Sequence, residues 1–263
     1  MKINTYNAWM LAVLFLVTAC GMNDGEKFIF EQAKVEKIVK IAPDDADSPQ
    51  CSVSLNIHYA TAENGPERAS QLNDKIERKF LAMTGLDMQQ AVDSFANKYT
   101  RDYVQYYAPL YREDRKDEQK RSWYEYHYVI ETDVQDGQKG VVVYLATLDY
   151  YEGGAHGINQ QFAMNFDQRT GHVYQLSDLF VPGYEQRLAH YLEKALCEKT
   201  GAKNKAGLQE MGYLFSMDMF APENFIMRDE TITFLYNPYE IAPYALGKTE
   251  LTLSWSELED IKK

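Results

Sequence analysis

Two short segments carry residue types that could recognise or transform a ligand. In the first, LDYYEGGAHG, the residues Glu152, Gly153, Gly154 and His156 follow one another within five positions. A carboxylate and an imidazole can exchange protons with a ligand, and adjacent glycines expose backbone amides and permit positive φ angles. One histidine and one glutamate do not form a complete catalytic set, and the glycines could instead shape a bulge in which His156 bonds a buried backbone group. We therefore treat these four residues as candidates for binding and name no catalytic residue.

The second segment, NPYEIAPY, contains Tyr239, Glu240 and Tyr244 and lies between two predicted strands. Its two prolines fix φ and stiffen the loop, and tyrosine offers apolar area with a polar tip. The loop is thus a candidate recognition edge. In the alternative interpretation both tyrosines fill the core, and Glu240 caps a helix or the turn at His156. A direct pair between Glu240 and His156 is also possible.

The sequence offers little support for other catalytic or metal chemistry. None of the five histidines has the close spacing of a zinc ligand pair, and there is no Gly-x-Ser-x-Gly motif. We predict neither a metal site nor a cofactor. A hydrolase is the alternative to a binding protein, because Asp149, Glu152 and Glu240 could gather around His156 as acid and base.

The N-terminus resembles a secretory signal of the lipoprotein type. A single lysine precedes an apolar run that ends in Thr18, Ala19 and Cys20, and the run is short for a membrane span. We expect residues 1–20 to be removed up to a diacylglycerated Cys20, and residues 21–27 to form a tether. An ordinary signal cleaved nearby is the alternative. A lipid would place the protein in the cell envelope, on the periplasmic face or the outer surface of the outer membrane.

The net charge of the chain restricts the classes of macromolecule that it could bind. Asp and Glu number 39 against 27 Lys and Arg, for a net charge of −12, and the basic residues are scattered. Nucleic acid requires a basic face, so we exclude it as a partner. A cationic partner would associate faster, although acidity also serves solubility.

Beyond Cys20, two cysteines remain, Cys51 and Cys197. An oxidising compartment would permit a disulfide between them. Cys197 falls off the apolar face of its predicted helix, and we expect two independent thiols.

Hydrophobic periodicity predicts an α+β fold with antiparallel sheets and packed helices, in the order ββαα followed by βββ-α-βββ. A period of two predicts strands, and a spacing of three or four predicts helices. The tyrosines of residues 99–111 have helical spacing, which indicates packing rather than a ligand groove. We expect an N-terminal subdomain at 28–120 and a C-terminal domain at 121–263. The predicted strands are 28–41, 51–60, 122–132, 140–151, 158–166, 225–227, 231–236 and 249–255, and the predicted helices are 66–81, 87–111, 184–200 and 205–212.

The two motifs, in this order and with a helix between them, resemble the C-terminal domain of RsiV-like anti-sigma factors. The same domain accompanies PdaC-type peptidoglycan deacetylases as a non-catalytic companion. The similarity covers roughly residues 140–258, and residues 28–120 resemble the domain that usually precedes it.

The resemblance implies an extracytoplasmic binding module. In the RsiV branch the ligand is lysozyme, so a lysozyme-like protein or peptidoglycan is the implied partner here. The sequence shows no sigma-binding segment and no deacetylase domain. We therefore expect only the ectodomain role, in a lipid-anchored binding protein of the cell envelope.

Overall fold

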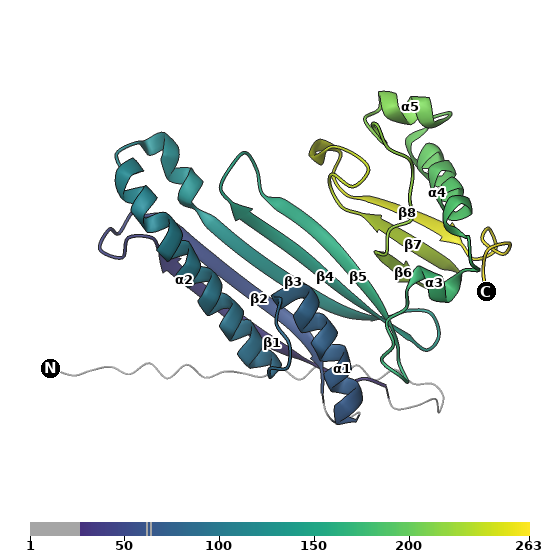
Figure 1. Cartoon of the computed structure of the whole chain (residues 1–263), viewed down its shortest axis with the longest axis horizontal. Coiled ribbons are helices and arrows are strands. Elements are labelled where there is room, and N and C mark those ends of the chain that lie inside the picture. The colour runs from purple at the N-terminus through teal and green to yellow at the C-terminus, as the bar shows by residue number, and fades with distance from the viewer. Residues whose placement is uncertain (1–26, 62, 64) are drawn as a thin grey trace.

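The computed structural model describes residues 27–61, 63 and 65–263 and contains two β-sheets (Figure 1). The predicted signal, Cys20 and all but the last residue of the predicted tether lie outside the described residues. The first sheet has five strands in the order β1-β2-β3-β4-β5. Their bounds are β1 Phe30–Lys40, β2 Gln50–Ala60, β3 Tyr126–Asp136, β4 Val141–Glu152 and β5 Ile158–Asp167.

Two helices, α1 (Pro66–Ile76) and α2 (Met88–Asp114), lie on one face of this sheet (Figure 1). Proline stands in the first turn of α1, where its missing N–H costs nothing. A π-helical turn, Glu77–Leu81, extends α1. The N-cap of α2 is Asp87, whose carboxylate accepts the backbone N–H groups of the second and third residues that follow it.

The five-stranded sheet is mixed, because β2 and β3 run parallel while the other three pairs are antiparallel. A parallel pair needs a long crossover, and α1 and α2 together supply it. The β3–β4 pair is a hairpin, and the dipeptide Asp136-Gly137, which favours tight turns, lies where β3 ends.

The second sheet is antiparallel, in the order β6-β7-β8, with helix α4 against β8. Leu188, Leu192 and Leu196 form the fully buried ridge of α4, as the spacing of four predicts. The bounds are β6 Phe225–Met227, β7 Thr231–Tyr236, β8 Thr249–Ser254, α3 Leu176–Leu179, α4 Glu185–Thr200 and α5 Lys205–Glu210.

These elements confirm the predicted α+β class. One hydrophobic core lies between α1, α2 and the five-stranded sheet, and a second lies between α4 and the three-stranded sheet. The expected boundary after residue 120 falls inside the five-stranded sheet, because β2 and β3 pair across it. The division between the two cores lies near the end of β5 instead.

Three asparagines join the two sheets. Asn165 of β5 donates its amide to the carbonyl of Phe225 (2.7 Å) and accepts the N–H of Met227 (2.9 Å). Asn224 and Asn237 reach back to the backbone of β5 at distances of 2.7 to 3.1 Å. Each side-chain amide bonds backbone N–H or C=O groups that a neighbouring strand would otherwise pair. The edges of β5 and β6 are therefore less available for pairing with another chain.

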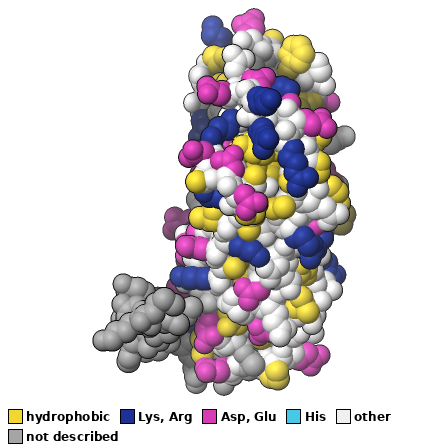
Figure 2. All heavy atoms as spheres, turned by 90° about the vertical axis from the view of Figure 1, so that its left-hand side faces the viewer, with side chains coloured by type: hydrophobic (Ala, Val, Ile, Leu, Met, Phe, Trp, Pro, Cys, Tyr) yellow, Lys and Arg dark blue, Asp and Glu magenta, His cyan; other side chains and the backbone are white. Residues whose placement is uncertain are grey.

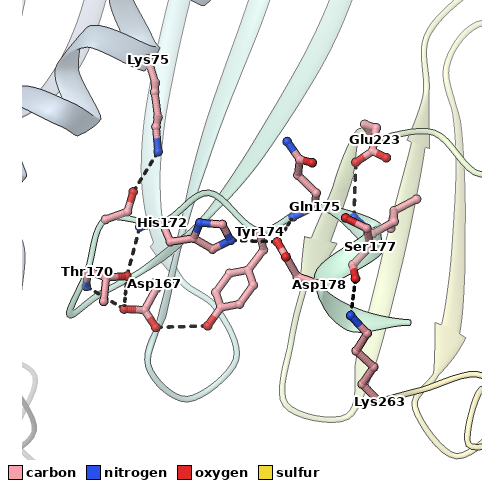
Figure 3. Close-up of polar contacts among 12 residues, drawn as sticks. Lys75, Asp167, Thr170, His172, Tyr174, Gln175, Ser177, Asp178, Glu223 and Lys263 are labelled. Carbon is pink, nitrogen blue, oxygen red and sulfur yellow. Dashed lines mark hydrogen bonds and ion pairs between the residues drawn. The ribbon is translucent and has the colours of Figure 1, made fainter. Parts of the chain in front are cut away.

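The segment after β5 is held by carboxylates (Figure 3). Asp167 accepts the N–H and hydroxyl of Thr170 and the hydroxyl of Tyr174. Burial opposes its charge, but these hydrogen bonds prevail and lower the pKa of Asp167 below its ordinary value. His172 bonds Asp178 at 2.8 Å, and that carboxylate also accepts the backbone N–H of Gln175, the N-cap of α3.

Lysines from both cores bind the same segment (Figure 3). Lys75 of α1 donates to the carbonyl of Gly171 (3.2 Å), and Lys263 donates to the carbonyl of Ser177 (2.6 Å). The connection between the two sheets is therefore tied to each of them.

Cys51 and Cys197 are free thiols, as expected. Burial is the main reason that the pKa of Cys51 rises to about 12, so this thiol is inert at neutral pH. None of the helices in the described part of the chain combines the length and the apolar composition that crossing a bilayer requires.

Candidate functional site

The turn between β4 and β5 requires its glycines for two different reasons. Gly153 and Gly154 have φ angles of 82° and 97°, which other residues adopt only with strain. A Cβ atom on Gly153 would also lie 2.9 Å from the carbonyl oxygen of Trp123, and one on Gly157 would lie 2.9 Å from that of Tyr150. The glycines therefore build a tight turn, hereafter the tip, residues 152–157.

The side chain of His156 extends from the tip and contacts the two tyrosines of the second motif. Its ring stacks on Tyr244 with centroids 3.9 Å apart and planes 17° apart, and its Nε2 lies 3.0 Å from the hydroxyl of Tyr239. Its Nδ1 lies 2.8 Å from the carbonyl of Gly157, which can only accept. The proton of the neutral ring is therefore on Nδ1, and Nε2 accepts the hydrogen bond of the tyrosine hydroxyl.

We call these three side chains, His156, Tyr239 and Tyr244, the histidine stack. His156 and Tyr239 are exposed, Tyr239 to 59 %, and Tyr244 is half-buried. Neither tyrosine fills the core. The structure thus brings together three of the residues that the sequence selected as candidates, from segments 83 positions apart.

The loop that carries Tyr239 is held in a strained form. Tyr239 has a φ of 73°, and its N–H donates to the carbonyl of Ala242 (2.9 Å). Glu240 accepts the backbone N–H of Asn237 at 2.8 Å. Glu240 therefore closes its own loop instead of pairing with His156. Strain of this kind persists only where the surroundings fix the conformation.

The side chain of Glu152 is directed to helix α2 and not to the loop of Tyr239. Its carboxylate accepts the hydroxyl of Tyr99 of α2 at 2.6 Å. Glu152, Glu240 and His156 thus have separate partners, and among the residues that the structure describes no contact joins the three. The acid–base cluster that a hydrolase would need is not assembled in this geometry.

An aromatic ladder lies beneath Glu152. Along α2 the rings recur every four residues, a rise of about 6 Å, and along β3 and the 3₁₀ helix before it (Glu118–Tyr124) they recur every two residues, also about 6–7 Å. The matching rises let the strand rings fit between the helix rings, with centroids 4.9 to 5.4 Å apart in the closer pairs. The helix rings are Phe95, Tyr99, Tyr103, Tyr107 and Tyr111, and the others are Tyr124, Tyr126 and Tyr128.

The ladder is therefore packing, as its spacing predicts, but the part of it between Phe95 and Tyr107 also borders a groove. This groove, hereafter the tyrosine groove, has a volume of about 270 Å³. Its walls are five residues of the ladder and Tyr106, which is 64 % exposed. The groove is lined by Phe95, Lys98, Tyr99, Asp102, Tyr103, Tyr106, Tyr107, Tyr126 and Glu152.

Two ladder tyrosines, Tyr99 and Tyr128, have a pKa above the ordinary value of tyrosine and remain protonated at physiological pH. Burial, with a smaller contribution from the charge of Glu152, raises the pKa of Tyr128 to about 12. Burial and the hydrogen bond to Glu152 raise the pKa of Tyr99 well above its ordinary range. Their hydroxyls are thus hydrogen-bond donors in a region of negative potential.

The tip connects the tyrosine groove with the histidine stack. Glu152 lines the groove at one end of the tip, and His156 belongs to the stack at the other. In Figure 1 the turn between β4 and β5 lies between the C-terminal end of α2 and the loop of residues 237–247. We call the groove, the tip and the stack together the aromatic face.

One polar cluster was not predicted from the sequence. On the face of the sheet opposite the helices, His127 lies 2.8 Å from Asp149, and Asn159 donates to the second oxygen of that carboxylate at 2.9 Å. These residues lie on three adjacent strands, and only the strand register shows that they meet. Among the described residues no group of three or more His, Cys, Asp or Glu is arranged to hold a metal ion.

The face on the left of Figure 1 carries basic, acidic and apolar side chains interspersed (Figure 2). It shows no continuous basic surface of the kind that phosphate backbones require.

Comparison with known proteins identifies the C-terminal part of the chain. Residues 177–256 match the family described as protein of unknown function DUF3298. A crystal structure of a DUF3298 member from Bacteroides fragilis NCTC 9343 is 28 % identical, with a TM-score of 0.83 over 90 % of this chain and 94 % of that one.

A DUF3298 protein from Pseudomonas aeruginosa PAO1 shares the fold, with 21 % identity and a TM-score of 0.63 over 90 % of this chain and 95 % of that one. No curated protein is significantly similar to the chain. Residues 177–256 therefore match the DUF3298 family, within a chain whose fold is similar to that of DUF3298 proteins along most of its length.

Proposed function

We propose that this chain is a lipid-anchored binding protein of the bacterial cell envelope, related to the RsiV-like ectodomains, and that its ligand binds at the aromatic face. The apolar run ending at Cys20 supports the anchor. The ligand is a protein of the lysozyme type or a glycan of the cell wall. The histidine stack is the observation that carries the proposal.

The stack suits binding because it is both exposed and fixed. Two hydrogen bonds orient His156, and the ring of Tyr244 supports it from one side at 3.9 Å. Rigid aromatic side chains lose little conformational entropy on binding, and tyrosine is enriched among the residues that dominate binding energy. The separation of the nearby carboxylates favours recognition over hydrolysis.

The binding proposal predicts a large loss of affinity when the stack is removed. We expect the double variant His156→Ala, Tyr239→Ala to bind at least about tenfold more weakly, because exposed aromatic contacts of this kind contribute about 2 kcal/mol or more at an interface. Calorimetric titration of the purified protein with lysozyme and with soluble muropeptides measures the affinity.

Helix α4 supplies the matched control. His190 and Tyr191 are also a histidine–tyrosine pair, with ring centroids 6.2 Å apart, but they lie on α4, where His190 is exposed and Tyr191 is half-buried and donates its hydroxyl to Asp260. The variant His190→Ala, Tyr191→Ala should retain the native affinity. Equal losses in the two double variants, or no binding of either probe by the native protein, would count against a ligand site at the stack.

The anchor is tested separately. Cells that express the native chain should incorporate labelled palmitate into the protein, and the Cys20→Ser variant should incorporate none and leave the membrane fraction. A protein that stays in the membrane fraction after this substitution would contradict attachment through Cys20.

A further inference from the structure

The tyrosine groove presents aromatic ring faces next to a carboxylate. A ring face carries negative electrostatic potential, so a cation above it is attracted, and the attraction grows when water is excluded. The Glu152 carboxylate lies at the same opening, fixed by the hydroxyl of Tyr99 at 2.6 Å. Both features favour a positively charged occupant.

The basic residue that lines the groove does not neutralise Glu152. Lys98 forms an ion pair with Asp102 at 2.5 Å, one helical turn further along α2. Asp102 also lies 3.7 Å from the guanidinium of Arg101. In the part of the chain that the structure describes, no ion pair involves Glu152. The groove therefore keeps one uncompensated negative charge among its rings.

The size of the groove also restricts the occupant. Its volume of about 270 Å³ is below the range of roughly 300–1,000 Å³ that encloses a drug-sized ligand. One extended side chain fits this space better than several sugar rings. A neutral sugar would also leave the charge of Glu152 uncompensated.

We infer that the tyrosine groove is a subsite for a lysine or arginine side chain of a polypeptide partner. The inference rests on the proposed binding function and extends it, since it identifies the chemistry of the ligand beside the histidine stack. The methylene stem of the side chain would pack on the rings of Tyr106 and Tyr107, and its charged end would meet Glu152. The net charge of −12 assists the encounter with a basic partner.

A titration with two probes tests the inference. The purified protein is titrated with hexalysine and with chitohexaose, a neutral glycan. We expect hexalysine to bind and the substitution Glu152→Gln to weaken its binding about tenfold, because a charge-assisted contact is lost. The substitution Tyr106→Leu should weaken it about threefold through loss of the ring face.

A matched variant separates the groove from the general acidity of the protein. Glu250 is an exposed glutamate of β8, so Glu250→Gln removes the same charge from the other sheet. It should change the affinity for hexalysine by less than about twofold. If Glu152→Gln weakens binding no more than Glu250→Gln does, the cation subsite is wrong. Chitohexaose binding that Tyr106→Leu abolishes and Glu152→Gln leaves intact would also overturn it, in favour of a glycan site.

The groove and the proposed function can fail independently. The double variant His156→Ala, Tyr239→Ala leaves the groove residues in place and should keep its affinity for hexalysine within about twofold. If the native protein binds hexalysine in a manner that depends on Glu152 but binds neither lysozyme nor muropeptides, the subsite stands and the proposed envelope ligand is wrong.

Discussion

The substitution Asn165→Ala is expected to lower the free energy of unfolding by about 2–4 kcal/mol. The Asn165 side chain is buried, with 1 % of its surface exposed, and it satisfies the carbonyl of Phe225 and the N–H of Met227. Alanine would leave both backbone groups buried without partners and would open a small cavity. Urea denaturation at neutral pH measures the loss.

Asn159, in the same strand, provides the control. Its amide donates to Asp149 on a partly exposed surface, so water can replace the lost hydrogen bond. Asn159→Ala should therefore cost less than about 1 kcal/mol. A cost for Asn165→Ala that does not exceed that of Asn159→Ala would mean that the asparagine junction does not hold the two sheets together.

The substitution Gly153→Ala is expected to destabilise the protein by about 2–4 kcal/mol and to weaken ligand binding at the stack. Two effects combine: the strain of a φ of 82° for a residue with a Cβ, about 1–2 kcal/mol, and the contact of 2.9 Å with the carbonyl of Trp123. Relief of this contact requires the tip to move away from Trp123. The histidine stack would lose its alignment, because His156 is carried by the same tip.

Gly140 separates the two effects. Its φ of 81° is nearly the same, but a Cβ atom there would have no neighbour within 4 Å. Gly140→Ala should show the strain alone, about 1–2 kcal/mol, with native affinity for the ligand. Thermal melts and calorimetry of both variants make the comparison. Equal losses of stability in the two would show that the close approach of the tip to Trp123 is unimportant.

Much of the fold could be predicted from periodicity. The ridge of α4, with leucines every four residues, and the alternating strands are local patterns, and local patterns survive folding when one face is buried. The pairing of strands is not local. The parallel contact between β2 and β3 depends on how α1 and α2 cross the sheet, and no pattern within either strand encodes it.

In the candidate site, too, the residues could be predicted from local sequence, whereas their contacts could not. The two motifs identify His156, Tyr239 and Tyr244, but their contact spans 83 positions and depends on how the sheets pack. The sequence does explain why Glu152 lies apart from the histidine stack. Alternation along β4 places it on the same face as Tyr144 and Tyr150, which is the face covered by the helices.

The asparagine junction and the tyrosine groove are only weakly indicated by the sequence. An asparagine within the apolar stretch FAMNF is unusual for a strand and could have marked Asn165 as a special position. Its two backbone partners lie about 60 residues away and could not be inferred. The ladder spacing of four predicted helical packing, while the groove beside the ladder depends on Glu152 and Tyr106 reaching the same opening.

The central claim is that ligands bind at the aromatic face, and NMR of the aromatic side chains tests it most directly. The protein is labelled with ¹³C in its tyrosine and histidine rings, and spectra are recorded during titration with lysozyme, muropeptides and hexalysine. We expect shifts at His156, Tyr239 and Tyr244 with the proposed envelope ligand and at Tyr106 and Tyr107 with hexalysine, while His190 and Tyr191 stay unchanged. Shifts confined to rings outside the aromatic face, or equal shifts at His190 and His156, would contradict the account.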